Sequence, residues 1–184
     1  MKLTLKDILQ SAQTLIDAEG LEALSMRAVA RRLDAEGSAL YWHVRNRGEL
    51  LTLVANGYYR RAFESVPEGL DWPRWLLAFG HAFHDELLSH RDAAHVCAMA
   101  GPENDEVDAS MNALAQPLVA LGLTRAQALS CQGSVIALTL GWATYEQSPP
   151  MRAYLSRALD LQASYRQGLA AMVQGLSHIN QTTD

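Results

Sequence analysis

Three consecutive side chains, Tyr41, Trp42 and His43, offer the most distinctive chemistry in this sequence. They stand between Leu40 and Val44, whose spacing places both on the buried side of one short helix. Because successive helical residues point about 100° apart, the three residues between them cannot all be buried. Two aromatic rings and an imidazole at a surface suit a DNA major groove, where they can contact thymine methyl groups, sugars, phosphates and base edges. The pattern therefore predicts a DNA-binding surface.

Nearby arginines also favour DNA binding. Arg27 lies near the start of the preceding predicted helix, within reach of a guanine edge or a phosphate. Arg45 and Arg47 flank the predicted cap of the following helix, and the first amides of a helix form a phosphate site themselves. The alternative for each of these arginines, taken singly, is ordinary solvation at the surface.

These residues need a scaffold, and the first part of the chain predicts four helices. The first ends at Gly20, and Ser25 is the expected cap of a short second helix. A third short helix is predicted over 38–44, and Asn46 followed by Glu49 is a capping-box arrangement for the fourth. Two short helices joined by a tight turn and braced by a preceding helix are typical of a helix-turn-helix. The alternative is any other small helical bundle.

The rest of the chain has the same helical periodicity. Apolar spacing and capping residues predict helices over 72–90, 107–121, 124–147 and 151–176, with a turn at 101–106. The sequence shows no alternating strand pattern and no internal repeat, so it predicts an all-α protein. We divide it into a DNA-binding domain over 1–48, a connecting helix over 49–66 and an effector-binding and dimerisation domain over 67–184.

Composition and charge exclude several classes of protein. Of the 184 residues, 49% are hydrophobic and 19% are charged, which is a globular balance. Residues 1–61 hold nine basic and seven acidic residues, whereas 62–184 hold six and thirteen, so a mildly basic head precedes an acidic body. Such a head suits a polyanionic partner. With no apolar run of membrane-spanning length and no secretory leader pattern, we expect a soluble, cytoplasmic protein with no membrane partner.

The stretch LIDAEGLEALSMRAVARRLDAEGSALYWHVRNRGELL resembles the DNA-binding head of the TetR family of transcriptional regulators, and LYWHVRN is close to the tetracycline repressor branch. The segments DWPRWLLAF, LLSHRDAAHV and TLGWATYEQ extend the resemblance into the body. It implies a homodimeric repressor whose C-terminal core binds a small molecule. Ligand binding would spread the two heads and release a palindromic double-stranded DNA operator.

The resemblance also implies which residues contact DNA. The matching positions are Arg27, Gly37, Ser38, Ala39, Tyr41, Trp42, His43 and Arg47. At the three small residues, 37–39, the tetracycline repressor carries Gln, Pro and Thr instead. We therefore expect the same docking on DNA with a different operator sequence.

The effector pocket departs further from the tetracycline repressor branch. That branch holds a magnesium–drug chelate with His, Asn, Thr, Arg and Glu, where this chain has Phe63, Phe79, Cys97, Ala100, Gly101 and Tyr145. These residues leave magnesium almost no oxygen ligands, so no metal or cofactor is expected. We expect an uncharged aromatic or lipophilic effector bound by Phe63, Phe79, Phe83, Cys97, Pro102, Trp142 and Tyr145. The alternative for each is a place in the packed core.

Other chemistry receives less support from the sequence. His81 and His84 have the spacing to share a metal, but no second ligand pair accompanies them. Cys97 beside a cavity would suit a redox or electrophile sensor, although a small buried hydrophobic residue is the alternative role. No nucleophile elbow or phosphate loop is present, so an enzyme is not expected. The competing function is a helical ligand-sensing module whose head docks a protein partner rather than DNA.

Small residues gather on one side of the last long predicted helices, at Ala126, Gly133, Ala137, Gly141, Ala158 and Gly168. The family resemblance implies that these helices meet their two-fold mates in a four-helix bundle. A two-fold dimer would match half-sites about one DNA turn, 34–36 Å, apart.

Overall fold

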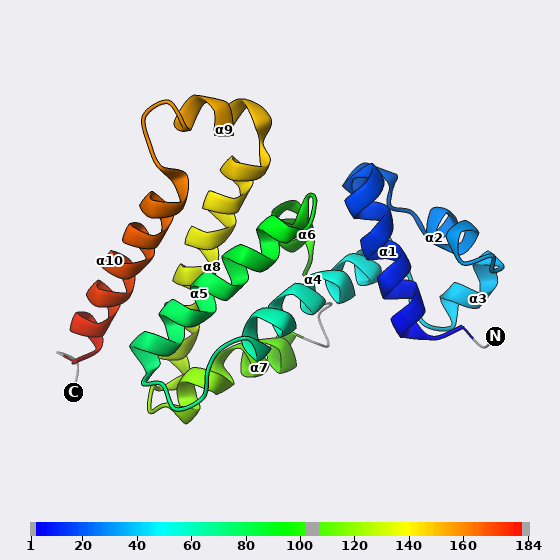
Figure 1. Cartoon of the computed structure of the whole chain (residues 1–184). Helices are drawn as coiled ribbons and strands as arrows, with labels where there is room; N and C mark the ends of the chain where they lie inside the picture. Colours follow the sequence, from blue (N-terminus) through cyan, green and yellow to red (C-terminus); the bar gives the residue numbers. More distant parts are fainter. Residues whose placement is uncertain (1–2, 102–106, 182–184) are drawn as a thin grey trace.

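The computed structural model describes residues 3–101 and 107–181, and within these ranges it contains helices and no strand. The all-α prediction is therefore confirmed. A small head and a larger helical body lie side by side, joined by one long helix (Figure 1). The head comprises α1 (Leu5–Glu19), the short 3₁₀ helix Leu21–Ala23, α2 (Met26–Arg32) and α3 (Gly37–Tyr41), and α4 (Arg47–Glu64) runs from it into the body.

Side-chain caps begin α1, α2 and α4, whereas α3 has no side-chain cap. The Thr4 side chain accepts a hydrogen bond from the Asp7 amide, and the Asp7 carboxylate caps Thr4 in return. Ser25 caps α2 in the same manner, through the Ala28 amide. For α4 the capping-box prediction is only half right: Asn46 accepts from the Glu49 amide, but the Glu49 carboxylate accepts from the amide of residue 45 instead. Each cap satisfies an amide that the helix leaves unpaired.

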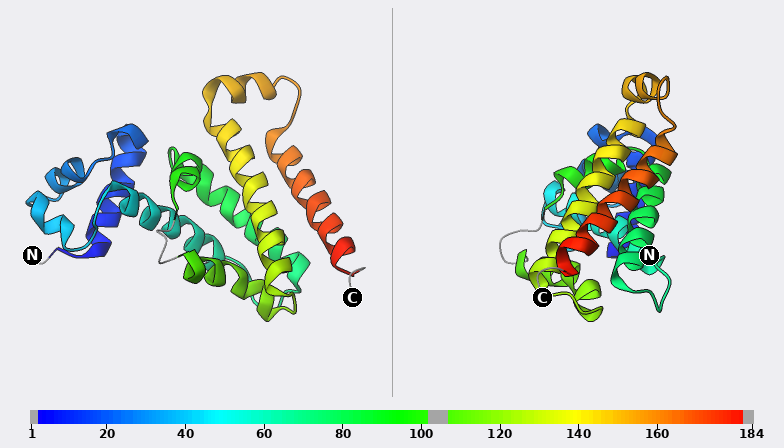
Figure 2. Two further views of the ribbon diagram at one scale, coloured as in Figure 1. Left: turned by 180° about the vertical axis from the view of Figure 1, so that it is seen from behind. Right: turned by 90° about the vertical axis from the view of Figure 1, so that its left-hand side faces the viewer.

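The body contains the remaining helices, and Figure 2 shows that α8 and α10 run side by side along one of its faces. Its helices are α5 (Trp72–Ser89), α6 (Ala93–Met99), α7 (Val107–Ala120), α8 (Arg125–Gln147), α9 (Pro149–Leu155) and α10 (Leu161–Gln181). Gly80 lets α10 approach α5 closely, because a Cβ atom at this position would lie 2.7 Å from the Leu169 side chain. No helix among these described residues is long and apolar enough to cross a bilayer.

Three helix predictions need correction. The expected helix over 151–176 is wrong: a separate helix, α9, starts at Pro149, because proline lacks only an amide hydrogen that the first helical turn does not use. The chain then turns, and α10 begins at Leu161. The third helix ends at Tyr41, three residues early, and α6 is a separate helix that the sequence reading missed. Most of the predicted turn at 101–106 lies outside the described residues.

Candidate DNA interface and effector pocket

Helix α3 turns its rings away from the protein. Leu40 and Val44 are buried in the head, while the Trp42 and Tyr41 side chains are 88% and 56% exposed and His43 is exposed as well. The predicted exposure of all three residues is therefore confirmed. A tryptophan so fully exposed gains nothing from the fold of this chain, so its apolar area is available to a partner.

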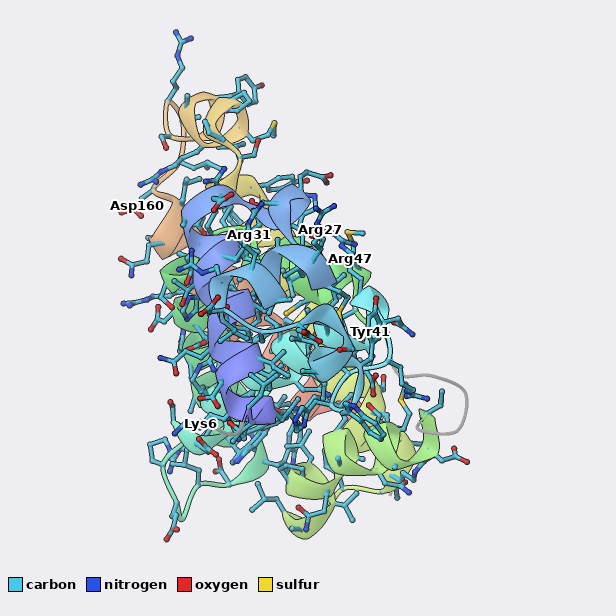
Figure 3. All side chains as sticks on the ribbon, turned by 90° about the vertical axis from the view of Figure 1, so that its right-hand side faces the viewer. Lys6, Arg27, Arg31, Tyr41, Arg47 and Asp160 are labelled. Atoms are coloured by element: carbon cyan, nitrogen blue, oxygen red, sulfur yellow. The ribbon has the colours of Figure 1, made fainter. Side chains whose placement is uncertain are left out.

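A second helix supplies positive charge at the same end of the molecule. Arg27 and Arg31 are exposed one turn apart on α2, and Figure 3 looks onto the end of the head where they lie with Tyr41. Arg31 was missed in the sequence, although its i+4 spacing from Arg27 places it on the same helix face. Around Gly37, at the start of α3, a Cβ atom would meet nothing within 4 Å, so a partner can come close to the backbone there.

Arg47 has a different role from the one expected. Its Nε donates to the Leu24 carbonyl oxygen at 2.9 Å and its Nη2 to the Leu21 carbonyl oxygen at 3.3 Å. The side chain is half-buried between α4 and the segment that precedes α2. Arg47 therefore braces the head internally, and we do not include it among the DNA contacts proposed below.

A pocket of about 730 Å³ lies between α4, α6, α7 and α8 in the body. Helix α4 contributes the largest side chains of its wall, Tyr59 and Phe63, and α6 contributes Cys97. Small residues complete the lining, among them Ala100, Gly101, Ala109, Ala113 and Gly133. Of the expected ligand-binding residues, Phe63 and Cys97 line this pocket, and Pro102 lies outside the described residues. Tyr59 was missed, although it stands four residues before Phe63 and so on the same helix face.

The other expected ligand-binding residues do not line this pocket. Phe79 and Phe83 are completely buried behind it, where they stack on Phe63 and Tyr59 with ring centroids 4.7 Å apart in both pairs. These two phenylalanines are packed core that holds the pocket wall. Trp142 and Tyr145 follow the pocket-lining part of α8 by roughly one and a half turns or more, too far along the helix to reach the cavity.

The pocket holds little charge. The Cys97 thiol is buried, and this burial raises its pKa to about 12, so the thiol stays protonated near neutral pH. Burial raises the pKa of the Tyr59 phenol as well. A protonated thiol is a poor nucleophile and a poor metal ligand, which does not favour the redox-sensor alternative. Arg60 and Glu64, whose side chains are exposed, are the charged residues that line the pocket.

The histidine pair on α5 does not form a metal site. His84 is buried, with its Nε2 2.8 Å from the Glu146 carboxylate, and it stacks on Tyr165. His81 is half-buried, and burial together with the Arg166 charge lowers its pKa. Within the described part of the chain, no group of three or more histidine, cysteine, aspartate or glutamate side chains is placed to hold a metal ion.

An exposed aromatic and basic surface on a helix-turn-helix, joined by one helix to a body with an apolar pocket, defines a DNA-binding transcriptional regulator. Residues 8–54 match the family model described as "Bacterial regulatory proteins, tetR family". The tetracycline repressor protein class E of Escherichia coli is 28% identical, with 96% of this chain and 92% of that protein covered. The chain belongs to the TetR family, near its tetracycline repressor branch.

Solved structures agree with this assignment. A Q116A variant of TetR from Acinetobacter baumannii AYE in complex with minocycline superposes with a TM-score of 0.77 at 26% identity, covering 97% of this chain and 98% of that one. The structure of BioQ with its natural double-stranded DNA operator gives a TM-score of 0.70 at 30% identity, covering 95% and 98%. Both similarities extend over head and body together.

Proposed function

We propose that this protein is a homodimeric repressor that binds a palindromic operator through α2 and α3 and is released by an uncharged aromatic or lipophilic effector. The observation that carries the proposal is the continuity of α4. Its first half buries Leu50, Leu51 and Val54 in the core, and its second half presents Tyr59 and Phe63 to the pocket. A ligand that favours one position of α4 would thereby favour one spacing of the heads.

The proposed DNA contacts lie at the free end of the head. They are the exposed residues Arg27, Gly37, Ser38, Tyr41, Trp42 and His43 together with the half-buried Ala39. Support comes from their shared surface and from the similarity to BioQ, which has been solved on its operator. With no long side chain at 37–39, reading of base edges would fall mainly on Arg27 and Tyr41. The head would correspond to residues 1–48, the connecting helix to 49–66 and the effector-binding and dimerisation domain to 67–184.

The experiment that tests operator binding begins with selection of bound sequences from random duplex DNA. Replacing Arg27 with Ala should weaken binding to the selected operator by about 1–3 kcal/mol and relax specificity at one base pair of each half-site. Arg27 is exposed, so stability should not change appreciably. Titrations by fluorescence anisotropy against the operator and its single-base variants measure both effects. Unchanged affinity and unchanged base preference would remove Arg27 from the interface.

The outer face of α8 supports the proposed dimer. Ala126, Ala137 and Gly141 are exposed along it, and a Cβ atom added at Gly141 or, on α10, Gly168 would meet nothing within 4 Å. A face of small residues allows the backbones of two copies to come close together. A two-fold dimer built on α8 and α10 would present two heads to one palindrome.

The link between pocket and head includes a polar contact. The Thr52 hydroxyl of α4 donates to the Gly101 carbonyl oxygen at 2.9 Å, just beyond the end of α6. Both residues line the pocket together with Cys97 and Phe63. A ligand that displaces the end of α6 would therefore act on α4 directly.

The chemistry of the lining argues against a magnesium–tetracycline effector. A class A TetR has been solved with 5a,6-anhydrotetracycline and magnesium, whereas the pocket of this chain presents Phe63, Cys97 and Gly101. A protonated thiol, a phenyl ring and a glycine offer magnesium no anionic oxygen. We expect anhydrotetracycline with magnesium to leave the melting temperature unchanged within error. A saturable rise that disappears on adding a chelator would contradict this expectation.

A further inference from the structure

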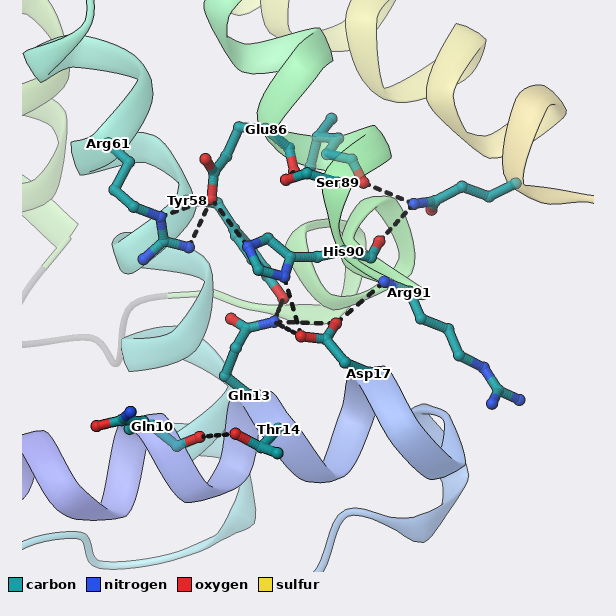
Figure 4. Close-up of polar contacts among 12 residues, drawn as sticks. Gln10, Gln13, Thr14, Asp17, Tyr58, Arg61, Glu86, Ser89, His90 and Arg91 are labelled. Carbon is teal, nitrogen blue, oxygen red and sulfur yellow. Dashed lines mark hydrogen bonds and ion pairs between the residues drawn. The ribbon is translucent and has the colours of Figure 1, made fainter.

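A polar junction fastens the head to the body, between the end of α1 and the segment that joins α5 to α6 (Figure 4). Asp17 Oδ1 accepts from the Arg91 amide at 3.1 Å, and Arg91 Nη1 donates to the Ala18 carbonyl oxygen at 3.1 Å. In the opposite direction, the Leu21 amide donates to Asp92 Oδ2 at 2.8 Å. These bonds cross between segments that lie more than 70 residues apart, and they fix where α1 lies on the body.

One imidazole lies at the centre of this junction, between two carboxylates. His90 Nδ1 is 3.0 Å from Asp17 Oδ2 on α1, and His90 Nε2 is 3.5 Å from Glu86 Oε1 on α5. The Glu86 carboxylate in turn binds the Arg61 guanidinium of α4, with 2.6 Å between the paired atoms. A continuous polar chain therefore runs from α4 through α5 to the head.

The strength of these contacts depends on the charge of His90. A neutral imidazole with its proton on Nδ1 can donate an ordinary hydrogen bond to Asp17, whereas an imidazolium makes that bond charge-assisted and also places a positive charge 3.5 Å from the Glu86 carboxylate. Histidine is the side chain whose charge ordinarily changes between pH 5 and 8. We propose that His90 is a pH-sensitive positioning residue for the DNA-binding head, whose protonation fastens α1 to the body. This proposal goes beyond repression and effector release, and it requires neither an operator nor an effector.

Charged and titratable groups reach His90 from every element packed around it. Asp17, Glu86 and Asp92 are acidic, and Arg61 and Arg91 are basic and already engaged with the groups named above. From α4 the Tyr58 ring lies 5.3 Å away, its hydroxyl accepts from Gln13 Nε2, and burial raises its pKa, so it stays neutral.

On its remaining side His90 faces a cavity. Its side chain is 24% exposed and lines a cavity of about 650 Å³ together with Glu146 and Arg152, from α8 and α9. Glu146 is paired with His84. This opening lets the His90 ring exchange protons with water while its two nitrogens remain directed at Asp17 and Glu86. Protonation is thus coupled to the contacts of the junction.

The test measures how firmly the head is held, using spin labels on the full-length chain. Labels are attached to cysteines introduced at the exposed positions Gln10 and Glu68, one in the head and one in the body. Both native cysteines are buried, and dilution with unlabelled chain suppresses distances between protomers. Between about pH 5.5 and about pH 8.5 the undocked fraction should rise roughly tenfold, as expected for loss of one charge-assisted hydrogen bond.

Two variants and a matched control decide the outcome. His90→Gln, which cannot change charge, should give a distance distribution that is independent of pH. Asp17→Asn should flatten the profile as well, because it removes the charged acceptor on α1. His95→Gln removes an exposed histidine from the neighbouring helix α6, and it should keep the wild-type pH dependence. The proposal is overturned if His90→Gln retains that dependence or if the wild-type distribution does not change with pH. Since no DNA is present, neither result bears on operator binding.

Discussion

Replacing Trp42 with Ala is expected to weaken operator binding by about 2 kcal/mol or more, roughly thirtyfold, while leaving the protein fully folded. The side chain is 88% exposed, so the fold loses almost no buried apolar area with it. The free energy of unfolding should therefore stay within about 0.5 kcal/mol of the wild-type value. Anisotropy titrations with the selected operator and urea denaturation of the same preparations measure the two quantities side by side.

A second exposed aromatic residue provides the control. Tyr154 on α9 is 69% exposed and lies at the end of the body remote from α3, so Tyr154→Ala should leave operator affinity unchanged (Figure 1). Equal losses in the two variants would mean that exposed aromatic residues act through solubility or assembly. If Trp42→Ala bound the operator as tightly as the wild type does, α3 would not be the recognition element.

The helices of the head could be predicted because their causes are local. Ser25 and Asn46 cap the helices that follow them, and the spacing of Leu40 and Val44 fixes the buried side of α3. Helix geometry then excludes burial of all three residues between them, although α3 itself ends at Tyr41, before Trp42 and His43. The role of Arg47 depends on carbonyl groups more than 20 residues away in the sequence, so no local pattern could reveal it.

The pocket was harder to predict, because a lining residue and a core residue have the same composition and spacing. Phe63 and Phe79 are both aromatic and face each other, yet only Phe63 reaches the cavity. Whether an aromatic residue lines the pocket or belongs to the core depends on how α5 packs behind α4. This packing is tertiary structure, which local spacing does not show. The missed position Tyr59 shares a helix face with Phe63, so a search along that face for a second aromatic residue would have found it.

The boundaries of α8, α9 and α10 show a third limit of prediction from the sequence. Two consecutive prolines end α8 and also begin α9, because proline suits the first turn of a helix as well as the break before it. The predicted single helix over 151–176 takes account only of the break, and it therefore combines α9 with α10. Met151, Tyr154 and Leu155 share one face of α9, but none of the residues of this helix is buried, so their spacing does not mark a separate packed element.

Filling the pocket is expected to separate effector response from DNA binding. Ala113 of α7 lines the cavity, so Ala113→Phe places a ring in the space that an effector would occupy. A neutral apolar fluorophore such as Nile red should bind the wild type and brighten, and it should bind the variant about tenfold or more weakly. The head lies far from this position and should bind the operator unchanged, so the variant becomes a repressor that such ligands no longer release.

The matched control introduces the same ring on the same helix outside the cavity. Ala120 is exposed at the end of α7 and does not line the pocket, so Ala120→Phe should keep wild-type dye binding. If both variants bound the dye as the wild type does, the fluorophore would occupy another site and the assignment of this pocket to the effector would fail. If Ala113→Phe also lost operator binding, the pocket and the head would be coupled without any ligand. On α4, Tyr59 stacks on Phe83 and Phe63 stacks on Phe79. These ring pairs would then transmit strain from the pocket wall to the head.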